Sequence, residues 1–148
     1  MGQTGATFQH KPFVKATTRS LFHIPLNMGR VFSKTFDTIE KAGALEKDQF
    51  VVLTRDLSPW KSEHYFSVNK EVTGEEMEYI SGDFRTRVFE GPYREAGRWY
   101  YELKVEISQS GKHPEAIYFY YTTCPKCAKY YGKNYVVGFA KMNNERVN

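Results

Sequence analysis

The sequence repeats glycine, proline and aromatic landmarks at a nearly constant spacing, and this spacing limits the possible folds more than any other feature. Five pairs of identical residues, one from each half of the chain, are 66 to 68 positions apart: Phe22 and Phe89, Pro25 and Pro92, Ile39 and Ile107, Gly43 and Gly111, and Pro59 and Pro125. The alternative is a chance alignment of common turn residues. We interpret the pattern as an internal duplication.

The first copy is predicted to run strand, helix, strand, strand. A Thr-rich, β-prone segment from Phe13 to Phe22 precedes a helix that Asn27 caps and Gly43 closes. That helix carries an apolar stripe at steps of four and three residues: Met28, Phe32, Phe36 and Ile39. Residues 49–53 and 65–72 then form two strands joined by a long connection.

The second copy follows the same order. A strand is predicted over 79–89, and a helix begins at Gly91-Pro92 and ends at Gly111. Its predicted core stripe consists of Ala96, Tyr100, Leu103 and Ile107. Strands over 117–121 and 135–142 complete the copy.

The predicted fold class is α+β, with duplicated β-α-β-β units related by a pseudo-two-fold axis and an antiparallel sheet carrying two helices. Residues 1–11 are expected to be a disordered lead and residues 143–148 a tail. Residues 12–142 form a single duplicated domain, with units 12–73 and 77–142. Each half is too small to be stable alone, so we expect the halves to pair and to leave a groove between their helices.

Charge and composition exclude several classes of function. The net charge of +4 is scattered without a block of like charges, which gives no nucleic-acid footprint. No apolar stretch is long enough to span a membrane, and no secretory signal precedes the domain. We therefore expect a cytoplasmic protein with reduced cysteines and no cofactor. The oligomeric state, monomer or homodimer, is left open.

Three segments resemble the GyrI-like small-molecule-binding domains, which also serve as multidrug effector-binding modules. They are Val-Asn-Lys-Glu-Val at 68–72, Ile-Ser-Gly-Asp-Phe at 80–84 and Val-Phe-Glu-Gly-Pro-Tyr at 88–93. The resemblance covers residues 13–142. It implies a GyrI-like, SHS2-type fold with an aromatic groove for hydrophobic, often cationic, compounds. Some members of that family look like hydrolases that open strained cyclopropane rings.

One departure from that family concerns its ligand-binding acid. Drug-binding members carry a Glu on the first strand after the second helix, whereas residues 117–121 contain no acidic side chain. Glu102, on the second helix, is the nearest replacement. Trp99 lies three residues before it, so both side chains should project from one helix face. An indole and a carboxylate suit a flat or cationic ligand. The alternative has Trp99 at the edge of the core and Glu102 in solvent.

Further aromatic residues are candidate ligand contacts. Tyr118 and Tyr120 point to one face of their strand and either line the groove or belong to the core. Trp60, at a loop tip beside Pro59, and Tyr65 act as ligand contacts or as packing lids. Together with Trp99 and Glu102 they complete the predicted ligand-binding set.

Cys124 and Cys127 form a C-x-x-C pair with three possible roles. A redox site needs the first Cys at a helix N-terminus early in a βαβ unit, and only 21 residues follow Cys127. Zinc needs two more ligands, and no second C-x-x-C exists. A structural loop, a metal site and a redox site all remain open, with the structural loop favoured and no metal site assigned.

The leading hypothesis is a stand-alone domain that sequesters hydrophobic, aromatic or cationic small molecules in the groove between the repeats. The alternative is a hydrolase for strained, cyclopropane-bearing electrophiles, with Glu102 as the general base. A metal or redox function at Cys124 and Cys127 is the third hypothesis.

Overall fold

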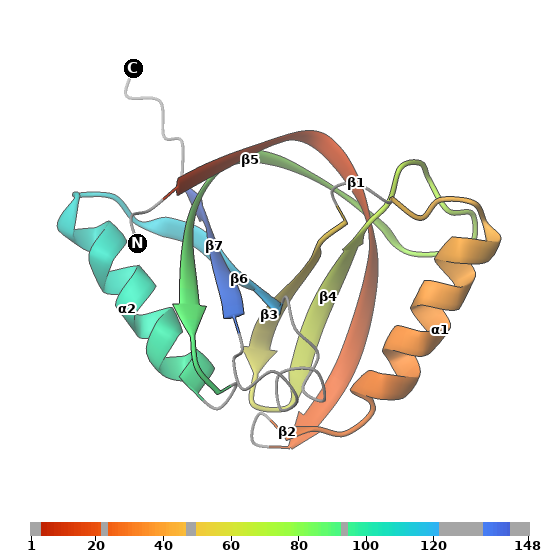
Figure 1. The fold of residues 1–148 in the computed structure, drawn as a ribbon, viewed down its shortest axis with the longest axis horizontal. Helices are drawn as coiled ribbons and strands as arrows, with labels where there is room; N and C mark the ends of the chain where they lie inside the picture. The colour runs from red at the N-terminus through yellow and green to blue at the C-terminus, as the bar shows by residue number, and fades with distance from the viewer. Residues whose placement is uncertain (1–3, 22–23, 47–49, 93–94, 122–134, 143–148) are drawn as a thin grey trace. The chain divides into compact units, whose positions relative to one another are not determined.

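The computed structural model describes residues 4–21, 24–46, 50–92, 95–121 and 135–142, which form two compact units. Unit 1 comprises residues 1–8 and 82–148, and unit 2 comprises residues 9–81. The elements are shown in Figure 1 and follow the order β1 (Thr4–Leu21), β2 (Ile24–Pro25), α1 (Met28–Lys41), β3 (Val52–Ser58), β4 (Lys61–Ser67), β5 (Met77–Glu90), α2 (Ala96–Gln109), β6 (Pro114–Tyr121) and β7 (Tyr135–Met142). In the described residues, no helix has both the length and the apolar character needed to cross a membrane.

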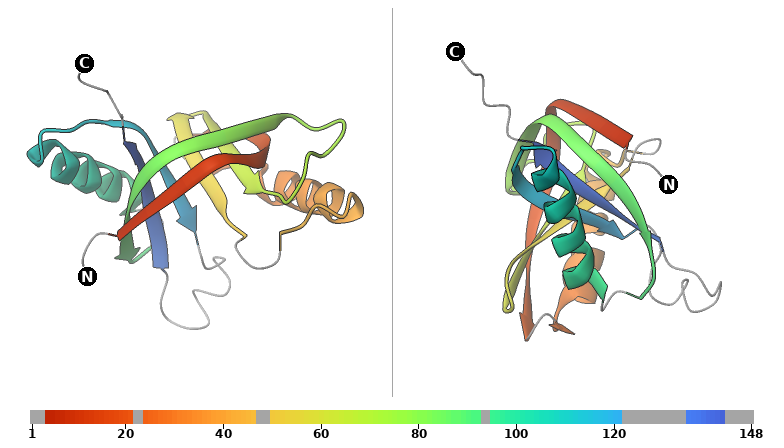
Figure 2. Two further views of the ribbon diagram at one scale, coloured as in Figure 1. Left: turned by 90° about the horizontal axis from the view of Figure 1, so that it is seen from above. Right: turned by 90° about the vertical axis from the view of Figure 1, so that its left-hand side faces the viewer.

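The predicted fold class is wrong, because the sheet is not an open one assembled from duplicated β-α-β-β units. The strands are hydrogen-bonded in the order β2-β1-β4-β3-β6-β7-β5, and β1 also pairs with β5. The pairing of β1 with β5 closes the series of six strands from β1 to β5, with the two-residue β2 attached beside β1. The sheet is therefore a closed antiparallel β-barrel that carries two helices. β1 and β5, which are hydrogen-bonded to each other, run side by side in the left view of Figure 2.

The length of β1 explains this difference. β1 has 18 residues and begins at Thr4, so residues 4–11, which we expected to be a disordered lead, form its first part. In unit 1, the Thr7 hydroxyl donates to the Asp83 carboxylate at 2.9 Å. In unit 2, the His10 amide donates to Ser81 Oγ at 2.7 Å. These contacts link positions more than 70 residues apart, and no local sequence pattern encodes them.

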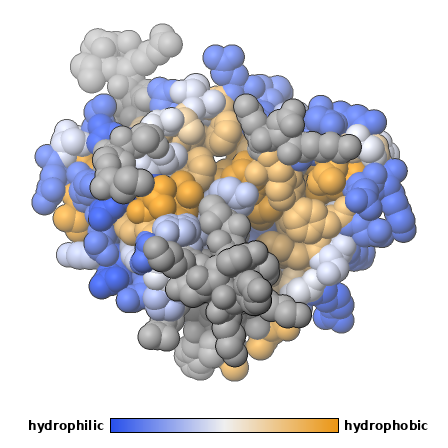
Figure 3. Space-filling model, viewed as in Figure 1, coloured by the Kyte–Doolittle hydropathy of each residue, from blue (hydrophilic) through white to orange (hydrophobic). Residues whose placement is uncertain are grey.

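Unit 2 packs helix α1 against strands β1, β3 and β4. Val14, Val52 and Phe66 lie beneath the helix, and Ile39 closes the apolar face of α1 over them. Phe32 and Phe36 pack against the margin of this cluster. Three members of the predicted stripe of α1, Phe32, Phe36 and Ile39, are therefore confirmed, whereas Met28 is half-buried and outside this cluster. The opposite face of α1 carries the hydrophilic side chains that appear blue on the right of Figure 3.

Unit 1 packs helix α2 against strands β5, β6 and β7. Its core contains Trp99, Leu103 and Ile107 from the helix, together with apolar side chains from the strands. Gly138 on β7 lies directly under the helix, where an added Cβ would be 3.0 Å from Leu103 Cδ2. The helix therefore approaches the sheet closely at this point.

The boundaries of the remaining elements agree with the sequence to different degrees. β7 spans 135–142 as predicted. Gly43 has a φ of +68°, the left-handed conformation expected of a helix-ending glycine. The β3–β4 hairpin differs from the prediction. Its turn is at Pro59-Trp60, and β4 begins at Lys61, four residues before the predicted start at Tyr65. Cys124, Cys127 and the tail from residue 143 lie outside the described residues.

Candidate functional site

Strand β4 directs alternate side chains to opposite faces of the unit 2 sheet. His64 and Phe66 point toward α1, where both rings contact Phe32 at centroid distances of 4.8 and 5.0 Å. Because a strand alternates, Glu63 and Tyr65 point to the face away from α1. Both of these side chains are buried, which makes this face a polar but poorly solvated environment.

The Glu63 carboxylate lies at the centre of a polar cluster on this face. Tyr65 Oη donates to Glu63 Oε1 at 2.7 Å, and Lys15 Nζ lies 2.8 Å from Oε2. The same ammonium group is 3.3 Å from a second carboxylate oxygen, Oε2 of Glu76. Arg55 is the register partner of Glu63 on β3. One lysine is thus shared between a buried carboxylate and a more exposed one.

The cluster keeps Glu63 ionised. Burial alone would raise the pKa of its carboxyl group, but the hydrogen bonds from Lys15 and Tyr65 and the charge of Arg55 outweigh it and hold the pKa below the usual 4.5. The hydrogen bond to Glu63 raises the pKa of Lys15 against the opposing effect of burial. At neutral pH the site therefore holds a carboxylate whose side chain is only 12% exposed.

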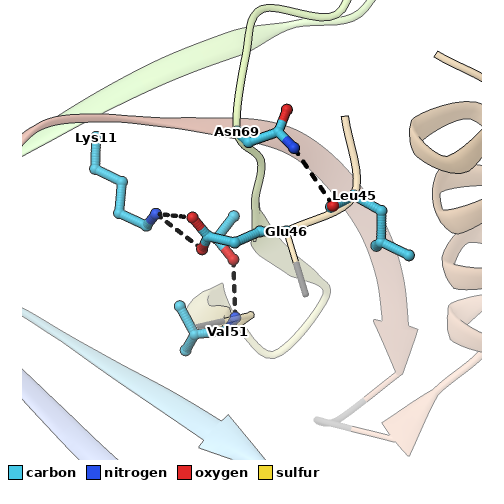
Figure 4. A network of polar contacts seen from close by, with 6 residues as sticks. Lys11, Leu45, Glu46, Val51 and Asn69 are labelled. Atoms are coloured by element: carbon cyan, nitrogen blue, oxygen red, sulfur yellow. Dashed lines mark hydrogen bonds and ion pairs between the residues drawn. The ribbon is translucent and has the colours of Figure 1, made fainter. Parts of the chain in front are cut away.

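A second ion pair in unit 2 has similar geometry. Lys11 Nζ lies 2.9 Å from both carboxylate oxygens of Glu46, as the close-up in Figure 4 shows. Nearby, the side-chain amide of Asn69 donates to the backbone carbonyl of Leu45. In this half-buried pair, unlike in the Glu63 cluster, the lysine forms an ion pair with one carboxylate among the described residues. The pair is therefore a suitable comparison for the Glu63 cluster.

Trp60 lies at the tip of the β3–β4 hairpin beside an open cavity of about 390 Å³. Its side chain is 50% exposed. The other residues that line the cavity come from β1 and the hairpin: Thr17, Arg19, Ser58 and Lys61. Thr17 is also the register partner of Glu63, so one residue that lines the cavity is paired with the residue that carries the buried carboxylate.

Trp99 and Glu102 lie in different environments, although they are three residues apart on α2. Trp99 is 2% exposed and its indole stacks on Phe89 at a centroid distance of 5.4 Å, inside the core of unit 1. Glu102 is partly exposed and lies 3.9 Å from Arg87 and 3.6 Å from Arg98. The structure therefore does not bring these two predicted residues together, and a role for either in ligand binding stays a prediction.

The strand face of the β6 tyrosines is defined by their neighbours. Ile117 and Phe119 belong to the core beneath α2, so Tyr118 and Tyr120 point to the opposite face of the unit 1 sheet. Tyr118 is buried and lies near Phe84. In each unit, the predicted tyrosines thus lie on the sheet face away from the helix. Ligand contact by Tyr118 and Tyr120 stays a prediction.

Within the described ranges, no group of three or more His, Cys, Asp and Glu side chains could hold a metal ion. The metal and redox hypotheses for Cys124 and Cys127 concern residues outside these ranges. Sequence reasoning missed Glu63 because it placed the start of the strand at Tyr65. The alternation of Glu63 and Tyr65 with His64 and Phe66 was the available signal for an earlier start.

The family of this protein follows from a match over nearly its whole length. The family model described as "Bacterial hydrolase" matches residues 3–142. The chain belongs to the bacterial hydrolase family. Comparison of this bacterial hydrolase family member with curated proteins finds no match.

Solved structures similar to this bacterial hydrolase family member are distant in sequence. The EcmrR C-terminal domain has a TM-score of 0.70 and 12% identity, with 96% of this chain and 97% of that chain covered. A hydrolase from Listeria innocua has a TM-score of 0.61 and 11% identity, with 95% and 91% covered. SAV2435 bound to tetraphenylphosphonium has a TM-score of 0.58 and 9% identity, with 97% and 95% covered. At such identities the likeness concerns the fold alone, and these neighbours are consistent with a GyrI-like fold.

Proposed function

We propose that this chain is a small-molecule-binding domain that takes up hydrophobic, aromatic cations, with Glu63 as the counter-charge. The observation that carries the proposal is the buried, ionised Glu63 carboxylate on a strand face that no helix of its own unit covers. Burying a charge is expensive, and such groups cluster at functional sites. The tetraphenylphosphonium complex of SAV2435 supports a cationic ligand, as a property of a protein with the same fold.

In this proposal, Lys15 holds the place of the ligand's positive charge. Its ammonium group is shared between Glu63 at 2.8 Å and Glu76 at 3.3 Å. A cationic ligand that displaces Lys15 from Glu63 leaves the lysine paired with Glu76, so no charge is left without a partner. Tyr65 keeps its hydrogen bond to Glu63 and offers its ring to the cation.

The test is calorimetric titration with two probes of similar shape, the cation tetraphenylphosphonium and the neutral triphenylphosphine oxide. For Glu63→Gln we expect cation affinity to fall about tenfold, which corresponds to about 1.4 kcal/mol. Affinity for the neutral probe should change by less than about twofold, because it does not use the charge. For Lys15→Met we expect tighter cation binding, since the competing ammonium is gone.

Two further variants make the test specific. Glu46→Gln removes the carboxylate of the other half-buried Lys–Glu pair and should leave the affinities for both probes unchanged. Glu102→Gln tests the carboxylate predicted from the sequence. Equal cation affinity in Glu63→Gln and the parent would refute the proposal, and a loss confined to Glu102→Gln would move the site to α2.

Hydrolysis is the second candidate, and two observations favour it. The family is described as bacterial hydrolase, and Tyr65 and Glu63 form a hydrogen-bonded pair of the kind that transfers protons. Glu63 accepts a proton from a water molecule while the water oxygen bonds to one carbon of the strained ring. The ring bond at that carbon breaks, its electron pair stays on the other ring carbon, and this carbon takes up the proton from Glu63, which returns to its carboxylate form. The low pKa of Glu63 makes it a weak base while Lys15 is in place.

Mass spectrometry separates the two candidates. A cyclopropane-bearing alkylating agent incubated with the protein should gain one water molecule if the chain is a hydrolase. The conversion should then disappear in Glu63→Gln and fall in Tyr65→Phe, while Glu46→Gln should keep the parent rate. Conversion that persists in Glu63→Gln but stops in Glu102→Gln would assign the base to α2. Binding of the intact agent without conversion would leave binding as the sole function.

A further inference from the structure

The cavity beside Trp60 combines one aromatic ring with two cations. It has a volume of about 390 Å³, within the range of small-molecule sites, and Arg19, Lys61 and Trp60 are among its five lining residues. Thr17 and Ser58 add two hydroxyl groups. This chemistry is opposite to that of the Glu63 cluster, because the charged side chains of the cavity are all positive.

The two cations lie directly opposite each other on neighbouring strands. Arg19 of β1 and Lys61 of β4 are register partners in the antiparallel ladder. Among the residues that the structure describes, no carboxylate forms an ion pair with either side chain. Opposed like charges destabilise a strand pair, and a bound anion would relieve that cost.

The backbone around Trp60 holds the indole at the cavity. The Trp60 carbonyl accepts a hydrogen bond from the Ser20 amide at 2.8 Å, which ties the hairpin tip to the end of β1. The Trp60 amide donates to Ser58 Oγ at 3.2 Å. A tip fixed at both its amide and its carbonyl loses little conformational freedom when a ligand stacks on the ring.

We propose that this cavity is a second binding site, for planar aromatic anions such as aryl carboxylates or aryl sulfonates. The acidic group binds between Arg19 and Lys61, and the aromatic ring stacks on Trp60. The site goes beyond the proposed function, because its proposed ligand contacts are Arg19, Lys61 and Trp60 and not Glu63 or Tyr65.

The probe for this site is naphthalene-2-sulfonate, with the neutral 2-naphthylmethanol as its uncharged counterpart. Calorimetry should show saturable binding of the sulfonate and much weaker binding of the alcohol. Arg19→Gln and Lys61→Gln should each weaken sulfonate binding by about fivefold, the size expected for an exposed ion pair. Trp60→Ala should weaken both probes. All three side chains are exposed, so the variants should fold.

A stability measurement separates a binding site from general charge attraction. Lys61→Gln should raise the melting temperature of the free protein, because it removes the opposed like charge, and should reduce the rise that the sulfonate produces. Lys34→Gln, on the exposed face of α1, changes the net charge by the same amount as Lys61→Gln. It should change neither the melting temperature of the free protein nor the rise that the sulfonate produces. Sulfonate affinity equal in Lys61→Gln and Lys34→Gln would overturn the proposal, and so would inorganic sulfate binding as tightly as the aryl sulfonate.

Discussion

His64 makes the stability of this protein depend on pH in a range that can be measured. The side chain is fully buried between α1 and the sheet of unit 2. Its two ring nitrogens lie 2.7 Å from the Thr18 hydroxyl and 2.9 Å from the Thr54 hydroxyl. Since each hydroxyl can donate or accept, the neutral ring is fully hydrogen-bonded. Burial lowers the pKa of His64 from 6.5 to about 4.

The size of the effect follows from this difference in pKa. Above pH 6.5 the imidazole is neutral in both the folded and the unfolded chain, so it contributes no pH dependence. Below pH 6.5 the unfolded chain binds a proton that the folded chain excludes, and the free energy of unfolding falls by about 1.4 kcal/mol per pH unit. The fall ends near pH 4, where the folded state also binds the proton, after a loss of about 3 kcal/mol.

Urea unfolding at pH values from 7.5 to 4 measures this loss, with His64→Gln as the variant that does not titrate. The parent should lose about 3 kcal/mol more than His64→Gln over this range, because the carboxylates contribute equally to both proteins. His113 is exposed, and His113→Gln should follow the parent curve. If the parent and His64→Gln curves run parallel within about 0.5 kcal/mol, the reasoning about burial is refuted.

Three further substitutions test the packing and the surface of unit 1 by urea unfolding. Trp99→Ala should lower the free energy of unfolding by about 3–5 kcal/mol, because the indole is a core side chain stacked on Phe89; a loss under about 1 kcal/mol would contradict that role. Glu102→Gln should lower the free energy of unfolding by less than about 1 kcal/mol, since its ion pairs are partly exposed; a larger loss would mean that its ion pair with Arg87 of β5 contributes more to stability than an exposed pair does. Gly138→Ala should cost about 1–3 kcal/mol, because the new Cβ would lie 3.0 Å from Leu103 and 3.1 Å from Phe89; an unchanged stability would mean that these side chains move aside freely.

The helices were predictable from sequence because their signals are local. The stripe of α1 and its closing glycine lie within a few turns of one another, and the structure confirms Phe32, Phe36 and Ile39 of the stripe as well as Gly43. The closed sheet was not predictable in this way. The pairing of β1 with β5 depends on contacts such as that between His10 and Ser81, which are 71 positions apart. Spacing between landmarks gives the order of elements but does not reveal which strand edges meet.

Helix α2 shows how periodicity can leave the buried face undecided. The predicted stripe contains Tyr100, which is 45% exposed, whereas Trp99 is 2% exposed. Both residues fit a helical period with Leu103 and Ile107. Trp99 lies four residues before Leu103 and Tyr100 lies three residues before it, and both spacings place two side chains on the same helix face. The larger apolar ring takes the core position, and the tyrosine keeps its hydroxyl at the surface. The prediction was therefore wrong for Tyr100, because the core position belongs to Trp99, the residue before it.

The position of the candidate site depends in the same way on one structural boundary. A strand that starts at Tyr65 leaves Glu63 in a solvated loop, where a carboxylate is unremarkable. The turn at Pro59-Trp60 instead starts β4 at Lys61, and this places Glu63 on the same face as Tyr65 and in register for Lys15 to reach it. The same turn sets Arg19 opposite Lys61. Both proposed sites therefore depend on this hairpin register, and a shift of one residue would send Glu63 to the α1 face, where His64 now lies.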